Sequence, residues 1–465
     1  SDLLITEANR FLWCECLGEQ GYGAPQAVAR VHDLDRFPDV FFDDPAGRVR
    51  LADMSGGGLH DIVLVHNGGV DYWPNLGYGR FGARLTMAGA PRFGDDFDPK
   101  RLFLADLNGT GCADLVYVDI DRVHLWFNQS GNQWSEGRTI LGTPMALTPD
   151  AVRCADVFGT GTCALVWSED FAALPESHYK ALDVCGGEKP YVLHEMRNGL
   201  GATTRVRYAP STRHFLDDQA AGTPWVTRLP FPVQVMEKVE VIDHIGRTKR
   251  VSTFRYHHGY FDGREREFRG FGRVDQCDTE TFDDFAADGL HPPGTPLVNV
   301  DAAYHAPPLE TRTWFHTGVY VDEGALAFDA LELTAAFQRE FYQGDAEAVR
   351  AGEHLVALGD APHEGYRALR GAGPRTAGYR RAGSARAAHP YSVVDHRHRV
   401  TLVQPAAGNP HGVYFRHALD SVTSHYERHP DDPRITQSLT LAADDHGHPV
   451  RNLAAGELRR RPPPG

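Results

Sequence analysis

The sequence predicts an all-β protein, in which part of a β-propeller is followed by a long antiparallel β-sheet. Three observations lead to this prediction. A unit of roughly 50 residues recurs in the first part of the chain, and alternating apolar and polar runs take over from about residue 191. The 465 residues also include 48 Gly and 30 Pro, which favour turns over long helices.

The repeat has three clear copies, which begin at Arg50–Asp53, Phe103–Asp106 and Arg153–Asp156. A glycine-rich turn and an apolar run follow each of these aspartates. A second part of the unit recurs as Tyr72–Phe81 and Leu125–Trp134, which we expect to adopt the same conformation in neighbouring four-stranded blades. Because a blade must pack on neighbours and a ring needs at least four, the chain is predicted to hold an incomplete ring. We therefore expect a partner, self-association or marginal stability.

The sequence divides into three predicted domains. Residues 1–185 are propeller blades, 186–290 a β-rich middle domain, and 291–465 a β-rich segment with a short helical insertion and a mobile loop near 371–388. The alternation over Val233–Val241 and Thr248–Tyr256 predicts a hairpin. The helix is predicted over Phe328–Tyr342. Further strands are predicted at the following ranges: Arg312–Phe315, His411–Arg416, Thr423–Glu427 and Ile435–Leu441.

Composition excludes several classes of function. A net charge of −15 disfavours binding to nucleic acid. No run of apolar residues is long enough for a membrane helix, so direct membrane insertion is not expected, and no signal peptide is recognisable. The seven cysteines include no C-x-x-C pair, which disfavours zinc sites and a dense disulfide framework. The first residue, Ser1, suggests a cut within a longer protein.

Several motifs carry a resemblance to a known family. The repeat resembles the FG-GAP/VCBS blade motif. The longer matches are these: Val49–Met54, Asp71–Gly77, Leu115–Asp119, Leu193–Asn198, Arg207–Thr212, Leu229–Val233, Asp262–Gly272, His425–Arg428 and Asp432–Ile435. Together they resemble the middle regions of SpvB/TcB-type proteins, the B components of insecticidal Tc toxin complexes, over nearly the whole chain.

The resemblance implies a structural function without catalysis. In that family the propeller docks on the pentameric A component and becomes the gate of the translocation channel. An RHS-type shell of β-strands, wound together with the C component, encloses a toxic polypeptide. The resemblance therefore implies A and C components as partners and no cofactor. It implies a secreted or extracellular location within a toxin complex, and a cytoplasmic one before release.

One metal site is a candidate. Asp106, Asn108, Thr110 and Asp114 have the spacing of a calcium loop, with oxygen ligands on a glycine-rich turn. The alternative is that these side chains only cap the backbone N–H groups of the turn. The first copy is a weaker match, and the third has Ala164 in place of the last aspartate.

Two other functions stay open at this point. The chain could be a free-standing propeller adhesin that binds glycan or protein. It could also be an ADP-ribosyltransferase, with Ser252-Thr253 and the Glu265/Glu267 pair as its motifs. The third serine is missing, however, and the roughly dozen residues between the motifs are too few for the intervening strands, so charge pairing across neighbouring strands is the favoured explanation of the glutamates. Nine of the 24 histidines lie between His389 and His448; they could sense acidification or simply decorate strand surfaces.

Overall fold

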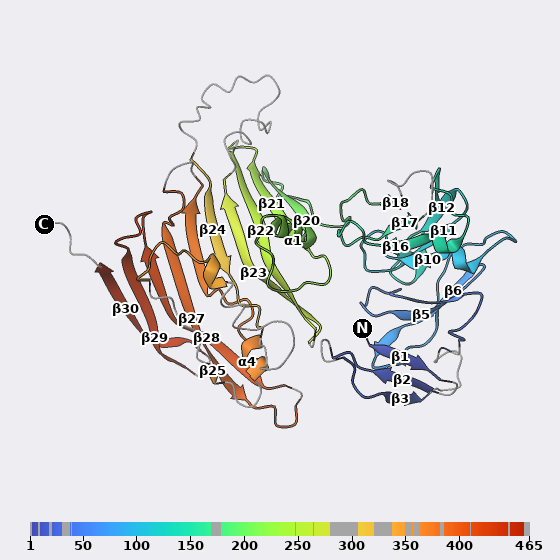
Figure 1. Cartoon of the computed structure of the whole chain (residues 1–465), viewed down its shortest axis with the longest axis horizontal. Helices are drawn as coiled ribbons and strands as arrows, with labels where there is room; N and C mark the ends of the chain where they lie inside the picture. Colours follow the sequence, from blue (N-terminus) through green and yellow to red (C-terminus); the bar gives the residue numbers. More distant parts are fainter. Residues whose placement is uncertain are drawn as a thin grey trace, which may run out of the picture. The chain divides into compact units, whose positions relative to one another are not determined.

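The computed structural model describes residues 2–7, 10–17, 21–29, 38, 40–168, 178–246, 248–263, 265–279, 306–319, 337–348, 356–357, 362–381, 386–409, 411–444 and 447–459 (Figure 1). These residues form two compact units. The first unit spans Ser1–Val192 with Phe231–Gln234, and the second spans Leu193–Pro230 with Val235–Gly465. Antiparallel strands dominate both units, as the all-β prediction requires.

The first unit consists of small antiparallel sheets. A three-stranded sheet contains β1 (Leu3–Thr6), β2 (Arg10–Cys14) and β3 (Gln26–Ala29). A four-stranded sheet contains β4 (Val49–Ala52), β5 (Asp61–His66), β6 (Gly69–Trp73) and β9 (Leu85–Thr86). The next contains β10 (Leu102–Ala105), β11 (Asp114–Val118), β12 (Arg122–Trp126) and β15 (Arg138–Leu141). A further three-stranded sheet contains β16 (Val152–Ala155), β17 (Ala164–Ser168) and β18 (Tyr179–Leu182).

The sequence repeat is also a structural repeat. In all three copies the last residue of the first strand pairs with the first residue of the second: Ala52 with Asp61, Ala105 with Asp114, and Ala155 with Ala164. In the first two copies a two-stranded hairpin follows the third strand. These hairpins are β7 (Asn75–Gly77) with β8 (Arg80–Phe81), and β13 (Asn128–Gln129) with β14 (Gln133–Trp134).

Successive copies contact each other in the same way. The Ala113 amide donates to the carbonyl of Asp53 at 2.7 Å, and the Cys163 amide donates to the carbonyl of Asp106 at 3.0 Å. The apolar side chains between copies form two clusters. One contains Met54, Val63 and Leu115, and the other contains Leu107, Val116 and Trp167. Each sheet thus buries its apolar face against the next, as the repeat predicts.

The second unit is built on one extended sheet (Figure 1). Its strands follow one another in chain order: β19 (Glu195–Arg197), β20 (Ala202–Pro210), β21 (Gln234–Asp243), β22 (Thr248–Asp262), β23 (Glu267–Asp278), β24 (Leu309–Trp314), β26 (Arg375–Arg380), β27 (Ser392–Gln404), β28 (Val413–His425), β29 (Arg434–Ala443) and β30 (Pro449–Arg459). The short β25 (Val356–Ala357) pairs in parallel with β27. Helices α1 (Ser211–Ala220) and α4 (Pro362–Arg367) accompany the sheet.

Several strand predictions are confirmed. β21 and β22 form the predicted hairpin, in which Asp243 pairs with Thr248. β24 and β29 cover the strands predicted near residues 312 and 435. The two short strands predicted at His411–Arg416 and Thr423–Glu427 are instead parts of the single strand β28, because the alternation continues between them and pairs with β27 throughout.

The predicted mobile loop near 371–388 is wrong over Arg375–Arg380, which form β26 between β24 and β27. Buried and partly exposed side chains alternate along this strand, with Arg375, Ala377 and Tyr379 on the buried face. Because the buried face includes a charged arginine, the sequence shows no alternation of apolar and polar residues here. Of the helix predicted over Phe328–Tyr342, residues 337–340 are helical, and the part before residue 337 lies outside the described residues. The three-domain division stays a prediction.

Candidate functional site

The predicted calcium loop is a turn held together by its own side chains. Asp106 accepts hydrogen bonds from the amides of Thr110 at 3.1 Å and Gly111 at 2.8 Å, through different carboxylate oxygens. The side-chain oxygen of Asn108 also accepts from the Thr110 amide, at 3.1 Å. Asp53 and Asp156 accept from the amides of the equivalent turns in their own copies. The turn-capping alternative therefore describes contacts that this structure contains.

Asp114 is buried and links three parts of its blade-like copy. Its carboxylate accepts from the amide of Leu107 at 3.1 Å and from that of Asn128 at 2.9 Å. Burial raises the pKa of Asp114 to about 7, although these two hydrogen bonds favour its charged form. Asp61 makes the same two contacts in the first copy, with the amides of Met54 and Asn75. These aspartates join the glycine-rich turn to the hairpin after the third strand.

The four predicted ligands thus lie on one turn and on the first residue of the strand that follows it. Within the described ranges, no group of three or more His, Cys, Asp or Glu side chains comes together as a possible metal site. The predicted loop has only two carboxylates, Asp106 and Asp114, so this finding does not bear on it and calcium binding stays a prediction.

The transferase motif is not assembled in this structure. Ser252 pairs with Asp278 across β22 and β23, whereas Glu267 pairs with Asp262. Ten residues of β22 separate these two positions, which places them roughly 33 Å apart along the strand. Ser252 donates to Asp278 at 2.8 Å. Glu267 forms ion pairs with Arg269 and Arg370. Glu265 faces Arg367 at 3.5 Å; Arg264 lies outside the described residues.

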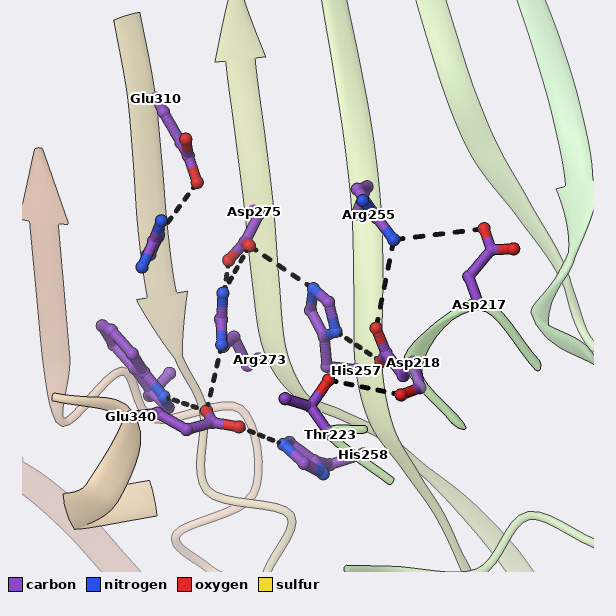
Figure 2. Close-up of polar contacts among 12 residues, drawn as sticks. Asp217, Asp218, Thr223, Arg255, His257, His258, Arg273, Asp275, Glu310 and Glu340 are labelled. Atoms are coloured by element: carbon purple, nitrogen blue, oxygen red, sulfur yellow. Dashed lines mark hydrogen bonds and ion pairs between the residues drawn. The ribbon is translucent and has the colours of Figure 1, made fainter. Parts of the chain in front are cut away.

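The structure reveals a different candidate, a buried ionic network in the second unit (Figure 2). His257, on β22, is its centre. Its Nδ1 lies 2.6 Å from Asp218 on α1, and its Nε2 lies 3.4 Å from Asp275 on β23. Burial alone would lower the pKa of His257, but the contacts with Asp218 and Asp275 outweigh burial and raise it. The two carboxylates therefore favour the charged form of the imidazole.

Arg273 extends the network along β23. Its guanidinium makes two hydrogen bonds with Asp275, at 2.7 and 2.5 Å, and lies 3.3 Å from Glu340. Glu340 also contacts Nε2 of His258 at 2.8 Å and accepts from the indole N–H of Trp314 at 2.9 Å. Although burial opposes ionisation, these partners lower the pKa of Glu340 to about 2. The charged forms of Arg273 and Glu340 are thus stabilised by their neighbours.

The network fastens α1 to the sheet. Besides His257, Asp218 accepts from the indole N–H of Trp225 at 2.7 Å. Arg255 approaches both Asp217 and Asp218, at 4.0 Å in each case (Figure 2). The helix buries Ser211, His214 and Asp218, all polar, rather than an apolar stripe. Its attachment therefore depends on specific hydrogen bonds and ion pairs.

Similar pairs continue across the sheet. Glu310 on β24 lies 2.8 Å from Arg312 and 2.6 Å from Arg381. Arg375 on β26 lies 3.0 Å from Asp395 on β27. Further along, Arg397 on β27 pairs with the buried Asp420 on β28. Charged pairs therefore connect β22 with β23, β26 with β27, and β27 with β28, and Glu310 joins β24 to the residue that follows β26. Such an arrangement fixes strand register and sheet geometry.

Three of the described C-terminal histidines have separate partners. His389 contacts the hydroxyl of Tyr342 at 2.6 Å, His411 contacts Glu364 at 2.9 Å, and His448 contacts Asp444 at 3.1 Å. Burial lowers the pKa of His417, and Arg399 adds to this effect. These described histidines have different partners on different elements.

Sequence comparison identifies the family. Two family sequence models match the chain. The one for the insecticide toxin TcdB middle/N-terminal region matches residues 128–288, and the one for the TcdB middle/C-terminal region matches residues 364–464. The chain belongs to the TcdB family. This confirms the resemblance to B components of insecticidal Tc toxins. The first match contains Asp218, His257, Arg273 and Asp275 of the network but not Glu340, and the second contains β26 to β30. A search of curated proteins finds no match.

Solved structures agree with this assignment. The chain is similar to one in the Photorhabdus luminescens Tc holotoxin pore, with 28% identity and a TM-score of 0.76, over 100% of this chain and 21% of the other. In the TcdB2-TccC3-Cdc42 crystal structure the identity is 30% and the TM-score 0.75, over 94% of this chain and 20% of the other. The TcdB2-TccC3 structure gives 29% identity and a TM-score of 0.75, over 94% and 21%. The sequence thus spans about a fifth of these TcdB chains.

Proposed function

We propose that the chain is a non-catalytic structural and docking module of a Tc-type toxin delivery complex. In this proposal the copies in the first unit are blades of an FG-GAP/VCBS-like β-propeller that docks on an A component and gates its channel. The extended sheet of the second unit is part of an RHS-type shell. Together with a C component, the shell encloses a toxic polypeptide before delivery outside the producing cell.

The observation that carries the proposal is the match to TcdB2 solved with TccC3, which extends over 94% of this chain. Two features of the structure support it. The copies of the first unit repeat the same pairing and the same hydrogen bond between copies, as stacked blades would. The second unit pairs eleven strands in chain order, several of them of ten residues or more, which is suited to a wall rather than to a compact catalytic domain.

The membrane finding is consistent with a module that does not itself insert. Among the described residues, no helix is long and apolar enough to cross a membrane. In this proposal translocation is left to the partner components. The adhesin alternative lacks an observation in its favour, because it offers no role for the extended sheet of the second unit.

A chimeric TcdB2 tests the proposal. The segment of TcdB2 that aligns with this chain is replaced by residues 1–465, and the chimera is co-expressed with TccC3. We expect the two to co-elute as one complex. A matched chimera with Asp275→Asn, which removes one charge from the network, should assemble less well. A chimera that is folded and monodisperse, yet does not bind TccC3, would contradict the proposal.

The absence of catalysis needs a separate assay. The chain alone should not consume NAD above the level of a buffer control. NAD turnover that is lost in Glu267→Gln would instead support the transferase alternative.

A further inference from the structure

Two cysteines lie side by side in the third copy of the repeat. Cys154 is on β16, and Cys163 directly precedes β17. Cys154 pairs with Leu165, so Cys163, two residues earlier, lies diagonally opposite on the same face. Both side chains are half-buried and pack against the apolar cluster between the second and third copies. The Cys163 thiol donates to the carbonyl of Ala164 at 3.7 Å, and both thiols are free in this structure.

The other copies show that neither the turn nor the core requires these cysteines. In the second copy the positions equivalent to Cys154 and Cys163 are Leu104 and Ala113, which follow from the equal registers. Leu104 and Ala113 pack against the corresponding cluster between the first and second copies. In the first copy the positions hold Leu51 and His60. Of the three copies, only the third therefore has cysteine at both of these positions.

We propose that Cys154 and Cys163 are a redox-sensitive thiol pair, which closes to a disulfide when the protein meets an oxidising disulfide such as oxidised glutathione. The bond would join β16 to the start of β17 and close the glycine-rich turn of the third copy. This site is independent of the toxin assembly proposed above, since it rests on contacts within one copy.

The chemistry is thiol–disulfide exchange. The neighbouring Cys154 thiol lowers the pKa of Cys163, which makes Cys163 the first nucleophile. Its thiolate attacks one sulfur of oxidised glutathione and releases the other glutathione as a thiolate. Cys154 then loses its proton and attacks the protein sulfur of the mixed disulfide, which releases the second glutathione. One disulfide is broken, one is formed, and the two protons pass to the glutathione thiolates.

Closure requires the backbone to move, because diagonal neighbours on paired strands lie about 7–8 Å apart, at the limit of what a disulfide spans. The two sulfurs must approach to the S–S bond length of about 2.05 Å. Cys163 lies before the first paired residue of β17, and its amide donates to the carbonyl of Asp106, so the adjustment falls on the end of the turn and on this contact with the second copy. Closing a loop of about ten residues should raise the melting temperature of the first unit by roughly 5–10 °C.

The test treats the whole chain with oxidised glutathione and maps disulfides by mass spectrometry of unreduced peptides. We expect one dominant cross-link, between Cys154 and Cys163, together with a rise in melting temperature that a reducing agent reverses. In Cys154→Ser, glutathione should remain attached to Cys163, because the second thiol is missing. Cys277→Ser, a change in the second unit, should leave the cross-link intact.

The matched control is the double variant Cys154→Leu with Cys163→Ala, which installs the pair that the second copy already has. It should melt like the reduced wild-type protein and show no response to glutathione. Three results would overturn the proposal: thiols at both positions that stay free after oxidation, a stable glutathione adduct on Cys163 of the wild-type protein, or a shift in melting temperature that persists in the double variant.

Discussion

Removing the charge of Asp275 should destabilise the second unit far more than removing an exposed charge. Asp275 lies between Arg273, with which it makes two hydrogen bonds at 2.7 and 2.5 Å, and His257 at 3.4 Å. The side chains of these three residues are between 10% and 14% exposed. The change Asp275→Asn preserves shape but leaves His257 with Asp218, and Arg273 with Glu340, as the remaining acidic partners.

The size of the effect follows from this burial. Breaking a buried ion pair by removing one partner costs about 3–5 kcal/mol. Since Arg273 retains Glu340, we expect a loss in the lower half of that range. At about 2–4 °C per kcal/mol for a large domain, the melting temperature of the second unit should fall by roughly 6–15 °C. Because burial opposes both charges, replacing Arg273 and Asp275 together by apolar residues should cost less than the single change.

The assay is thermal and urea unfolding of the whole chain, with the transition of the second unit assigned by hydrogen exchange of peptides from β22 and β23, which belong to that unit alone. The matched control is Glu427→Gln, which removes one charge from an exposed pair with Arg434. That pair is 60% and 38% exposed, so its loss should cost about 1 kcal/mol or less. If Asp275→Asn is no more destabilising than Glu427→Gln, the network does not hold the sheet and α1 together in the way described.

Three further predictions concern the network and the repeat. The pKa of His257 is higher in the folded protein than in the unfolded chain, where it is about 6.5. The charged imidazole therefore contributes its full stabilisation below about pH 6.5, and this stabilisation is lost as pH rises through the folded pKa. The difference in unfolding free energy between wild type and His257→Gln should therefore shrink with rising pH in titrations of the two proteins; a constant difference would contradict it. Asn128→Ala removes buried hydrogen bonds to the carbonyls of Met54 and Ala113 and should cost about 2–3 kcal/mol in the first unit by urea unfolding, whereas an unchanged midpoint would show that Asn128 does not join the copies. If the loop that ends at Asp114 binds calcium, calorimetry should show heat that Asp114→Asn abolishes; no heat and no thermal shift would leave the turn-capping role alone.

The repeat and its register were accessible from the sequence because they depend on local patterns. The recurring Asp, the glycine-rich turn and the apolar run specify a strand, a turn and a second strand within about 15 residues. The same holds for the hairpin of β21 and β22, where alternation and a short turn lie next to each other. The structural role of Asp114 was less accessible, since its contact with Asn128 depends on the hairpin that follows β12.

The ionic network could not be predicted from the sequence, because its residues are far apart along the chain and are charged or polar, so they leave no pattern of apolar residues. His257 meets Asp218 across 39 residues, and His258 meets Glu340 across 82. Helix α1 buries polar side chains, so the helical period of apolar residues that would predict it is weak. β26 was not predicted for the same reason. Its buried face includes Arg375, which forms an ion pair with Asp395 on the next strand, so the strand lacks an apolar pattern in the sequence. Charge pairs found only in the fold replace apolar contacts at these positions.

The most direct test of the central claim is a cryo-EM structure of the TcdB2 chimera in complex with TccC3. We predict that the copies that begin at Arg50, Phe103 and Arg153 occupy successive positions around one ring, related by a constant rotation. We also predict that β19 to β30 run unbroken within a closed shell that contains TccC3 strands. Copies that pack in an open or irregular cluster, or an extended sheet that lies outside the shell, would contradict the account.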